Sequence, residues 1–188
     1  MAVRYEYMTS DDFKDAYKLK REKIYSKIAK IGSIEAEKIM QKEYIKLCEE
    51  AAGGDCVAQD LLAEWFRNGN QVVKENIDLS MKWLFLAGAN GNKFSLDRLK
   101  IHFNSVFYQI YDLADFDYII AKKHLTEENA PYVIGKIVCE ELVEYLKIDA
   151  LELARADIRS LPYSAIIMRG FDRAVDKCFE RIKEKLRK

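Results

Sequence analysis

A pattern of glycines and apolar residues recurs along this chain at intervals of 35 to 37 residues. Aligning Gly54 with Gly91 shifts the chain by 37 residues and places Leu62 on Leu99. A further shift of 35 residues places Leu99 on Ile134. Self-similarity at a period of about 20–50 residues is typical of stacked units, each of which buries its apolar face against the next. The chain is therefore predicted to fold as an array of such units.

Within each unit the apolar residues are spaced by three and four, which is the helical period, and only 2 prolines occur in 188 residues. We predict a single all-α domain over 1–188, in which stacked antiparallel helix pairs form a short α-solenoid closed by a long C-terminal helix. The predicted pairs are 10–31 with 33–52, 55–68 with 76–90, 93–107 with 113–124, and 131–147 with 149–159, and the capping helix covers 162–186. The alternative is a globular helical bundle that contains one repeat pair.

One unit is clearer than its neighbours. Segment 50–92 reads EAAGGDCVAQDLLAEWFRNGNQVVKENIDLSMKWLFLAGANGN, and it resembles the Sel-one-like repeat, a relative of the tetratricopeptide repeat. The matching positions are Gly54, Ala58, Gln59, Leu62, Phe66, Gly69, Val73, Trp83, Ala87 and Gly91. The chain departs from the family pattern at Ala63, Asn76, Ser80 and Gly88, and by one extra residue before Val73. We interpret 10–52 as an N-terminal helix pair and 93–159 as degenerate repeats.

This resemblance implies a non-catalytic module for protein–protein interaction, with the work of an adaptor, a regulator or an assembly factor. A narrower version is a bacterial immunity-type protein that binds and neutralises a toxin. The partner is then a protein or peptide, which binds in a concave helical groove, and no cofactor is implied.

If the first helix of each pair lines the inner curve, periodicity names its positions outside the core. The predicted partner-binding residues are Asp60, Glu64, Arg67 and Asn68 in the clear repeat, Phe94, Asp97 and Asn104 in the second copy, and Tyr132, Lys136 and Glu140 in the third. This mixture of charges with a few apolar anchors favours a protein or peptide over a phosphate or a lipid. The alternative is a plain solvated face. We assign Trp65, Phe66 and Trp83 to the core.

The charge balance narrows the class of partner. Lysine and arginine together number 31, as do aspartate and glutamate, so the net charge is zero. A dedicated nucleic-acid binder needs a basic surplus, and we expect no nucleic-acid partner.

No signal peptide and no uninterrupted apolar run of about 20 residues is found, so we expect no membrane segment. The four cysteines form no C-x-x-C pair, and we expect buried thiols in a reducing cytoplasm.

Catalytic and metal-binding motifs are absent from the sequence, and we expect neither an enzyme nor a metal site. His102 and His124 are interpreted as structural or surface residues, and Glu140 and Glu141 as ordinary helix surface. Two alternatives stay open. One is an enzyme with a pocket between the repeats and the C-terminal helices, which a histidine beside a carboxylate would favour. The other is a self-assembling protein with an exposed apolar end face.

Overall fold

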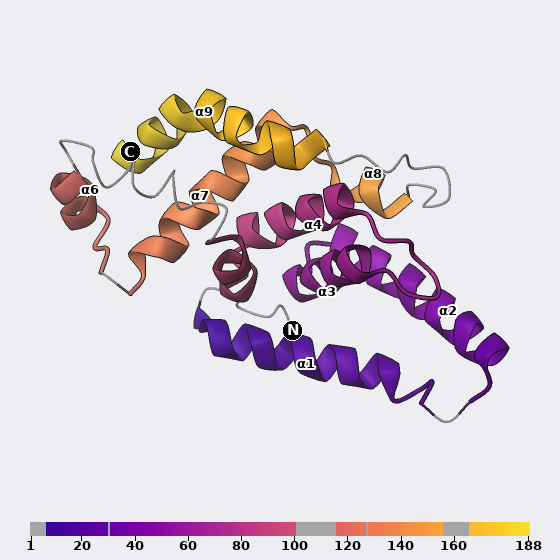
Figure 1. The fold of residues 1–188 in the computed structure, drawn as a ribbon. Helices are drawn as coiled ribbons and strands as arrows, with labels where there is room; N and C mark the ends of the chain where they lie inside the picture. Colours follow the sequence, from indigo (N-terminus) through magenta and orange to yellow (C-terminus); the bar gives the residue numbers. More distant parts are fainter. Residues whose placement is uncertain (1–6, 30, 101–115, 127, 156–165) are drawn as a thin grey trace.

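The computed structural model describes residues 7–29, 31–100, 116–126, 128–155 and 166–188, and in these ranges all the regular structure is helical (Figure 1). The helices are α1 (Ser10–Tyr25), α2 (Ser33–Ala52), α3 (Cys56–Asn68), α4 (Ile77–Ala89), α6 (Phe116–Lys122), α7 (Ala130–Tyr145), α8 (Ala150–Arg155) and α9 (Ile166–Arg187). Residues 93–100 are also helical and are called segment 93–100 below. The all-α prediction is confirmed for this part of the chain. None of its helices combines the length and apolarity that crossing a membrane requires.

Side-chain caps fix where several helices begin. Thr9 accepts a hydrogen bond from the Asp12 amide while the Asp12 carboxylate accepts one from the Thr9 amide, so α1 begins with a capping box. Asp55 accepts hydrogen bonds from the amides of Val57 and Ala58 and so caps the start of α3. Asn76 begins α4 in the same way.

The ends of four helices share one turn, in which the second residue after the helix has a positive φ. These residues are Gly54 (92°), Gly91 (84°), His124 (51°) and Lys147 (51°), after α2, α4, α6 and α7 respectively. In each turn the next amide donates to a carbonyl five residues back, for example Asp55 to Glu50 and Asn92 to Ala87. This is the Schellman arrangement, in which glycine has no steric penalty.

The α3–α4 hairpin forms the centre of the molecule. Its helices run antiparallel, because the Ser80 hydroxyl donates to the Ala63 carbonyl at 2.7 Å, and Asn90 at the far end of α4 donates to Gln59 near the start of α3 at 3.0 Å. The small Ala63 allows this close approach. The predicted core residues Trp65, Phe66 and Trp83 are all buried.

Helix α7 packs closely against α4 at Gly88, which has no side chain. A Cβ atom at Gly88 would lie 2.6 Å from Cys139 Sγ and 2.9 Å from a methyl group of Leu96. Gly135 faces the same leucine, and a Cβ there would lie 3.2 Å from it. Leu96 of segment 93–100 thus fills the space that two glycines leave between α4 and α7.

Helix α9 runs antiparallel to α7 and packs along it (Figure 1). The expectation that Glu141 is ordinary helix surface is wrong, because its side chain is fully buried between these helices. It forms ion pairs with Arg181 at 2.7 Å and with Lys185 at 2.6 Å. Two cations thus compensate a carboxylate that burial alone would disfavour.

Two of the predicted pairings differ in the structure. Helix α8 packs chiefly against α2, and α9 instead takes the place beside α7 that the prediction gave to 149–159. Helix α1 ends at Tyr25 instead of residue 31 and packs against α3, while it meets α2 through side-chain ion pairs. Of the predicted second pair 93–107 with 113–124, residues 101–115 lie outside the described part of the chain.

Candidate partner-binding face

The predicted partner-binding residues lie on three elements, α3, segment 93–100 and α7. Arg67, Asn68, Asp97 and Lys136 are exposed, while Glu64, Phe94, Tyr132 and Glu140 are partly buried. Asn104 lies outside the described residues. Contacts join several of these residues into one surface: the Tyr132 hydroxyl donates to Asp97 at 3.5 Å, and Lys136 pairs loosely with Glu140 at 3.8 Å.

Asp60 is an exception, because the prediction placed it outside the core and its side chain is completely buried. Its Oδ1 accepts hydrogen bonds from the Ser95 hydroxyl at 2.6 Å and from Arg98 at 2.9 Å, both in segment 93–100. Burial raises the pKa of Asp60, although Arg98 and Ser95 oppose the shift. The physical reason for the error is that segment 93–100 packs directly over this turn of α3. Asp60 therefore positions Arg98 and cannot itself contact a partner.

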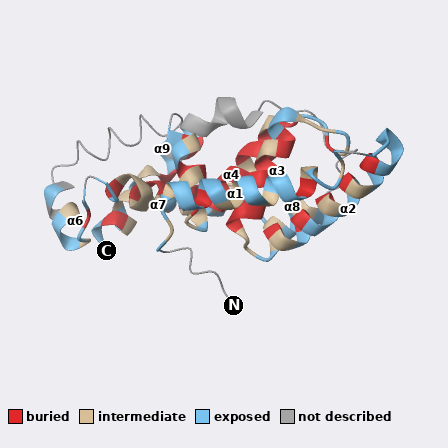
Figure 2. Ribbon diagram, turned by 90° about the horizontal axis from the view of Figure 1, so that it is seen from below, coloured by how far each residue is buried: buried red, intermediate tan, exposed pale blue. Residues whose placement is uncertain are grey.

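Helix α1 covers part of the predicted face. It packs against α3 and crosses in front of it in Figure 2. Phe13 is fully buried in a small cluster with Cys56, Val57 and Ala87, and this cluster is separate from the main core. We call these three partners of Phe13 the socket. About one turn of helix further on, Tyr17 packs its ring against Phe94, with 5.6 Å between ring centroids.

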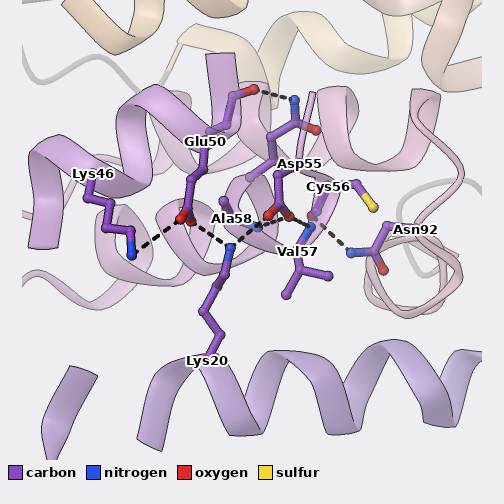
Figure 3. Close-up of polar contacts among 10 residues, drawn as sticks. Lys20, Lys46, Glu50, Asp55, Cys56, Val57, Ala58 and Asn92 are labelled. Atoms are coloured by element: carbon purple, nitrogen blue, oxygen red, sulfur yellow. Dashed lines mark hydrogen bonds and ion pairs between the residues drawn. The ribbon is translucent and has the colours of Figure 1, made fainter. Parts of the chain in front are cut away.

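In the polar contacts of α1, the side chains beneath the helix are all carboxylates. Lys20 reaches from α1 to Glu50 at 2.7 Å and to Asp55 at 2.8 Å (Figure 3). Asp55 uses its other oxygen to cap α3, so one side chain both begins a helix and binds a second one. Burial opposes the charge on Lys20, yet the hydrogen bonds to Asp55 and Glu50 raise the pKa of Lys20 above its usual value.

Three further contacts follow the length of α1. The Ser10 hydroxyl donates to Asp97, Arg21 lies 3.5 Å from Glu64, and Lys27 pairs with Glu43. The carboxylates that α1 contacts come from α2, α3 and segment 93–100. They are Glu43, Glu50, Asp55, Glu64 and Asp97, and together with the socket we call them the acidic face.

Sequence reasoning missed the basic side of this contact. It named Glu64, Phe94 and Asp97 but not Lys20, Arg21 or the partly buried Arg98. One signal was available, because the predicted partner-binding residues include four acids (Asp60, Glu64, Asp97 and Glu140) and only two bases (Arg67 and Lys136), which favours basic partners elsewhere in the chain. Which lysines and arginines supply them depends on how α1 packs, and its own periodicity does not specify that.

A small hollow lies between α1 and α2, with a volume of about 90 Å³. It is lined by Lys20, Lys23, Ile24, Lys27, Glu43, Lys46, Leu47 and Glu50. Across residues 7–29, 31–100, 116–126, 128–155 and 166–188, no group of three or more His, Cys, Asp or Glu side chains is placed to hold a metal ion. His124 is exposed in the turn after α6, and His102 lies outside the described residues.

No protein-family model matches the chain, and neither a curated protein nor a solved structure matches it.

Proposed function

We propose that this protein is a non-catalytic module that binds a protein or peptide partner on the surface formed by α3, segment 93–100 and α7. The observation that carries the proposal is that this surface already binds a helix. Aromatic side chains of α1 pack on it at Phe94 and in the socket, and hydroxyl and cationic groups of α1 meet its carboxylates. Apolar anchors surrounded by charged pairs are the usual composition of a protein-recognition surface.

A stacked arrangement of Sel-one-like units is part of this proposal. Two observations support it within the described residues. The aligned positions Leu62, Leu99 and Ile134 are all fully buried. The aligned glycines Gly54 and Gly91 form the same helix-ending turn. Repeated units that place equivalent helices side by side generate an extended surface along their first helices, which suits an elongated ligand.

The departures from the repeat pattern also have local explanations that fit a stack. Asn76, which replaces an aspartate, caps α4 equally well through its side-chain oxygen. Ser80 replaces an alanine and donates to the Ala63 carbonyl across the hairpin. Gly88 replaces an alanine where Cys139 of the third copy packs against α4. Adaptor, regulatory and toxin-neutralising roles are versions of this function, and four buried unpaired thiols suit a cytoplasmic location.

Site-specific photo-crosslinking in cells tests the proposal. A photoreactive amino acid replaces Arg67, Asp97 or Lys136 in turn, and each of these side chains is exposed on the proposed surface. Matched controls replace Lys42 on α2 and Lys177 on α9, which are exposed elsewhere. We expect one discrete protein adduct at the surface positions that is missing at the controls. Adducts of equal yield at both sets of positions, or none at the surface, would contradict the proposed function.

A further inference from the structure

We propose that the acidic face is a receptor for a basic amphipathic helix of another protein, and that α1 is a resident occupant which such a helix displaces. This inference rests on the proposed function and names the chemistry of the partner. It is carried by three properties of the contact between α1 and the rest of the molecule: the separate apolar anchor, the charge complementarity, and the one-sided distribution of charge on α1.

The apolar anchor of α1 is small and local. Phe13 and Ile24 are the buried residues of α1, whereas Leu19 and most of its polar residues are exposed. Phe13 occupies the socket, whose members Cys56, Val57 and Ala87 belong to α3 and α4. Ile24, near the other end of α1, belongs instead to the main core. The socket is separate from that core, so it is the place on α1's contact surface where one aromatic side chain can replace another.

The charges are complementary in a way that specifies the partner. Five carboxylates of the acidic face are compensated by Ser10, Lys20 and Arg21 of α1 and by Lys27 in the turn that follows it. When α1 leaves, these carboxylates lose those four partners, while Glu50 keeps Lys46 at 3.7 Å, Asp97 keeps Tyr132 and Asp55 keeps the amides that it caps. A helix that carries both cations and an aromatic anchor restores both kinds of contact, which an acidic or a purely apolar helix does not.

The acidic residues of α1 are kept away from the contact. Asp11 and Asp15 are exposed, and Asp12 is engaged with Thr9 in the cap of its own helix. The contacting residues follow helical spacing along one stripe: Phe13, Tyr17, Lys20, Arg21, Ile24 and Lys27. The partner helix is thus expected to carry aromatic residues at i and i+4 and basic residues at i+7 and i+8.

The first test releases α1 from an otherwise complete chain. A protease recognition sequence inserted after Ala29 allows the connection between α1 and α2 to be cut once the protein has folded. The probe is a fluorescein-labelled peptide of residues 7–29, and its binding is followed by fluorescence anisotropy. We expect the probe to exchange into the cut protein and not into the uncut one. Loss of helical circular dichroism after cutting, or no exchange, would make α1 a fixed part of the core and overturn the inference.

Matched peptides test whether the contact chemistry decides binding. Lys20→Glu with Arg21→Glu reverses two contacting cations, while Lys14→Glu with Lys18→Glu makes the same change of net charge on the exposed side of α1. We expect the first peptide to bind at least about tenfold more weakly than the unchanged peptide and the second to bind like it. Equal weakening by both pairs of substitutions would show that net charge alone drives binding, and this result would overturn the proposed specificity.

A host peptide tests whether a foreign helix can occupy the face. It keeps only the six residues of the contacting stripe and has alanine, glutamine and glutamate elsewhere. We expect it to compete for the cut protein within about tenfold of the α1 peptide, because the stripe supplies the contacts. Failure of the host peptide would show that recognition needs the rest of α1. A concentration-dependent dimer of the uncut protein that Arg21→Glu abolishes would instead assign the face to a second copy of this chain.

The two proposals fail in different ways. If the α1 peptide does not exchange but crosslinks are observed at Arg67 and Lys136, the proposed function stands. The inference that α1 can be displaced is then overturned. If the peptide exchanges with the expected selectivity but no crosslink forms in cells, the acidic face is a helix receptor occupied only by α1, and the assignment to another protein's helix is overturned.

Discussion

At Gly88 the backbone of α4 comes so close to α7 that a methyl group has no space. In a Gly88→Ala variant the new Cβ meets Cys139 Sγ and Leu96. Alanine gains about 1 kcal/mol of helix propensity over glycine, but overpacking a core costs about 1–3 kcal/mol. We expect the free energy of unfolding to fall by about 1–2 kcal/mol, as measured by urea denaturation.

A matched glycine and a second substitution control this result. Gly32 has no neighbouring atom within 4 Å of a built Cβ, so Gly32→Ala changes stability by only about 0.5 kcal/mol. Adding Cys139→Ala to Gly88→Ala removes the closest clashing atom and is expected to recover part of the loss. A Gly88→Ala variant as stable as the parent would show that α7 shifts away freely.

The thiol of Cys56 gives the stability of the protein a dependence on alkaline pH. Burial raises the pKa of Cys56 to about 12 from its ordinary value of 9.0, and Asp55 adds to the shift. The thiol stays protonated in the folded state while it ionises in the unfolded state, so its contribution is complete below pH 9 and is lost as the pH rises toward 12. Each such group lowers the free energy of unfolding by about 1.4 kcal/mol per pH unit in this window.

We therefore expect the free energy of unfolding to fall less steeply above pH 9 in a Cys56→Ala variant than in the parent. Urea denaturation at a series of pH values measures this slope. Val57→Ala is the matched control, because it shrinks the same socket without removing an ionisable group. Equal slopes in the parent and the Cys56→Ala variant would mean that the thiol ionises equally in both states.

Among the elements, α1 is held to its neighbours partly by ion pairs. Lys20→Met keeps the length of the side chain but removes the charge that joins Glu50 and Asp55. We expect a loss of about 1 kcal/mol in the free energy of unfolding, since the side chain of Lys20 is only 23% exposed. Lys18→Met is the control, because Lys18 is exposed and its distance to Asp15 is 3.8 Å. If both substitutions lower the free energy of unfolding equally, the ion pairs of Lys20 do not stabilise the protein more than an exposed pair does.

The ends of several elements follow from the sequence because they depend on adjacent residues. Asp55 predicted the start of α3, and the glycine pair after Ala52 predicted the end of α2. The pairing of elements is different, because it depends on residues far apart in the chain. The pattern of α7 does not specify that α9 covers it, and the burial of Glu141 becomes possible only when Arg181 and Lys185 arrive with α9.

At the scale of the whole molecule, periodicity predicted Glu64, Phe94 and Tyr132 on one side of neighbouring helices. Equivalent positions nevertheless differ in exposure, since Asp60 is buried and Asp97, 37 residues later, is exposed. Periodicity could not predict that α1 lies over this side. The polar contacts of α1 and the turn after it involve residues 16 to 87 positions away, such as Glu43 from Lys27 and Asp97 from Ser10. Complementarity of that kind becomes visible only when the fold places the two partners together.

Such an arrangement predicts that the molecule opens in two stages. The α3–α4 hairpin is buried on several sides, whereas α1 is attached by Phe13 in the socket, by Ile24 in the main core and by ion pairs. Salt weakens such ion pairs, because the screening length falls to about 3 Å at 1 M ionic strength. In native-state hydrogen exchange we expect amides of α1 to exchange with a lower opening free energy than those of α3 and α4. Raising the salt concentration should lower protection in α1 and leave α4 unchanged, because a displaceable helix held by charge must loosen before the core does. Equal protection of α1 and α3 would mean that they open together, and no partner helix could then reach the acidic face without unfolding the receptor.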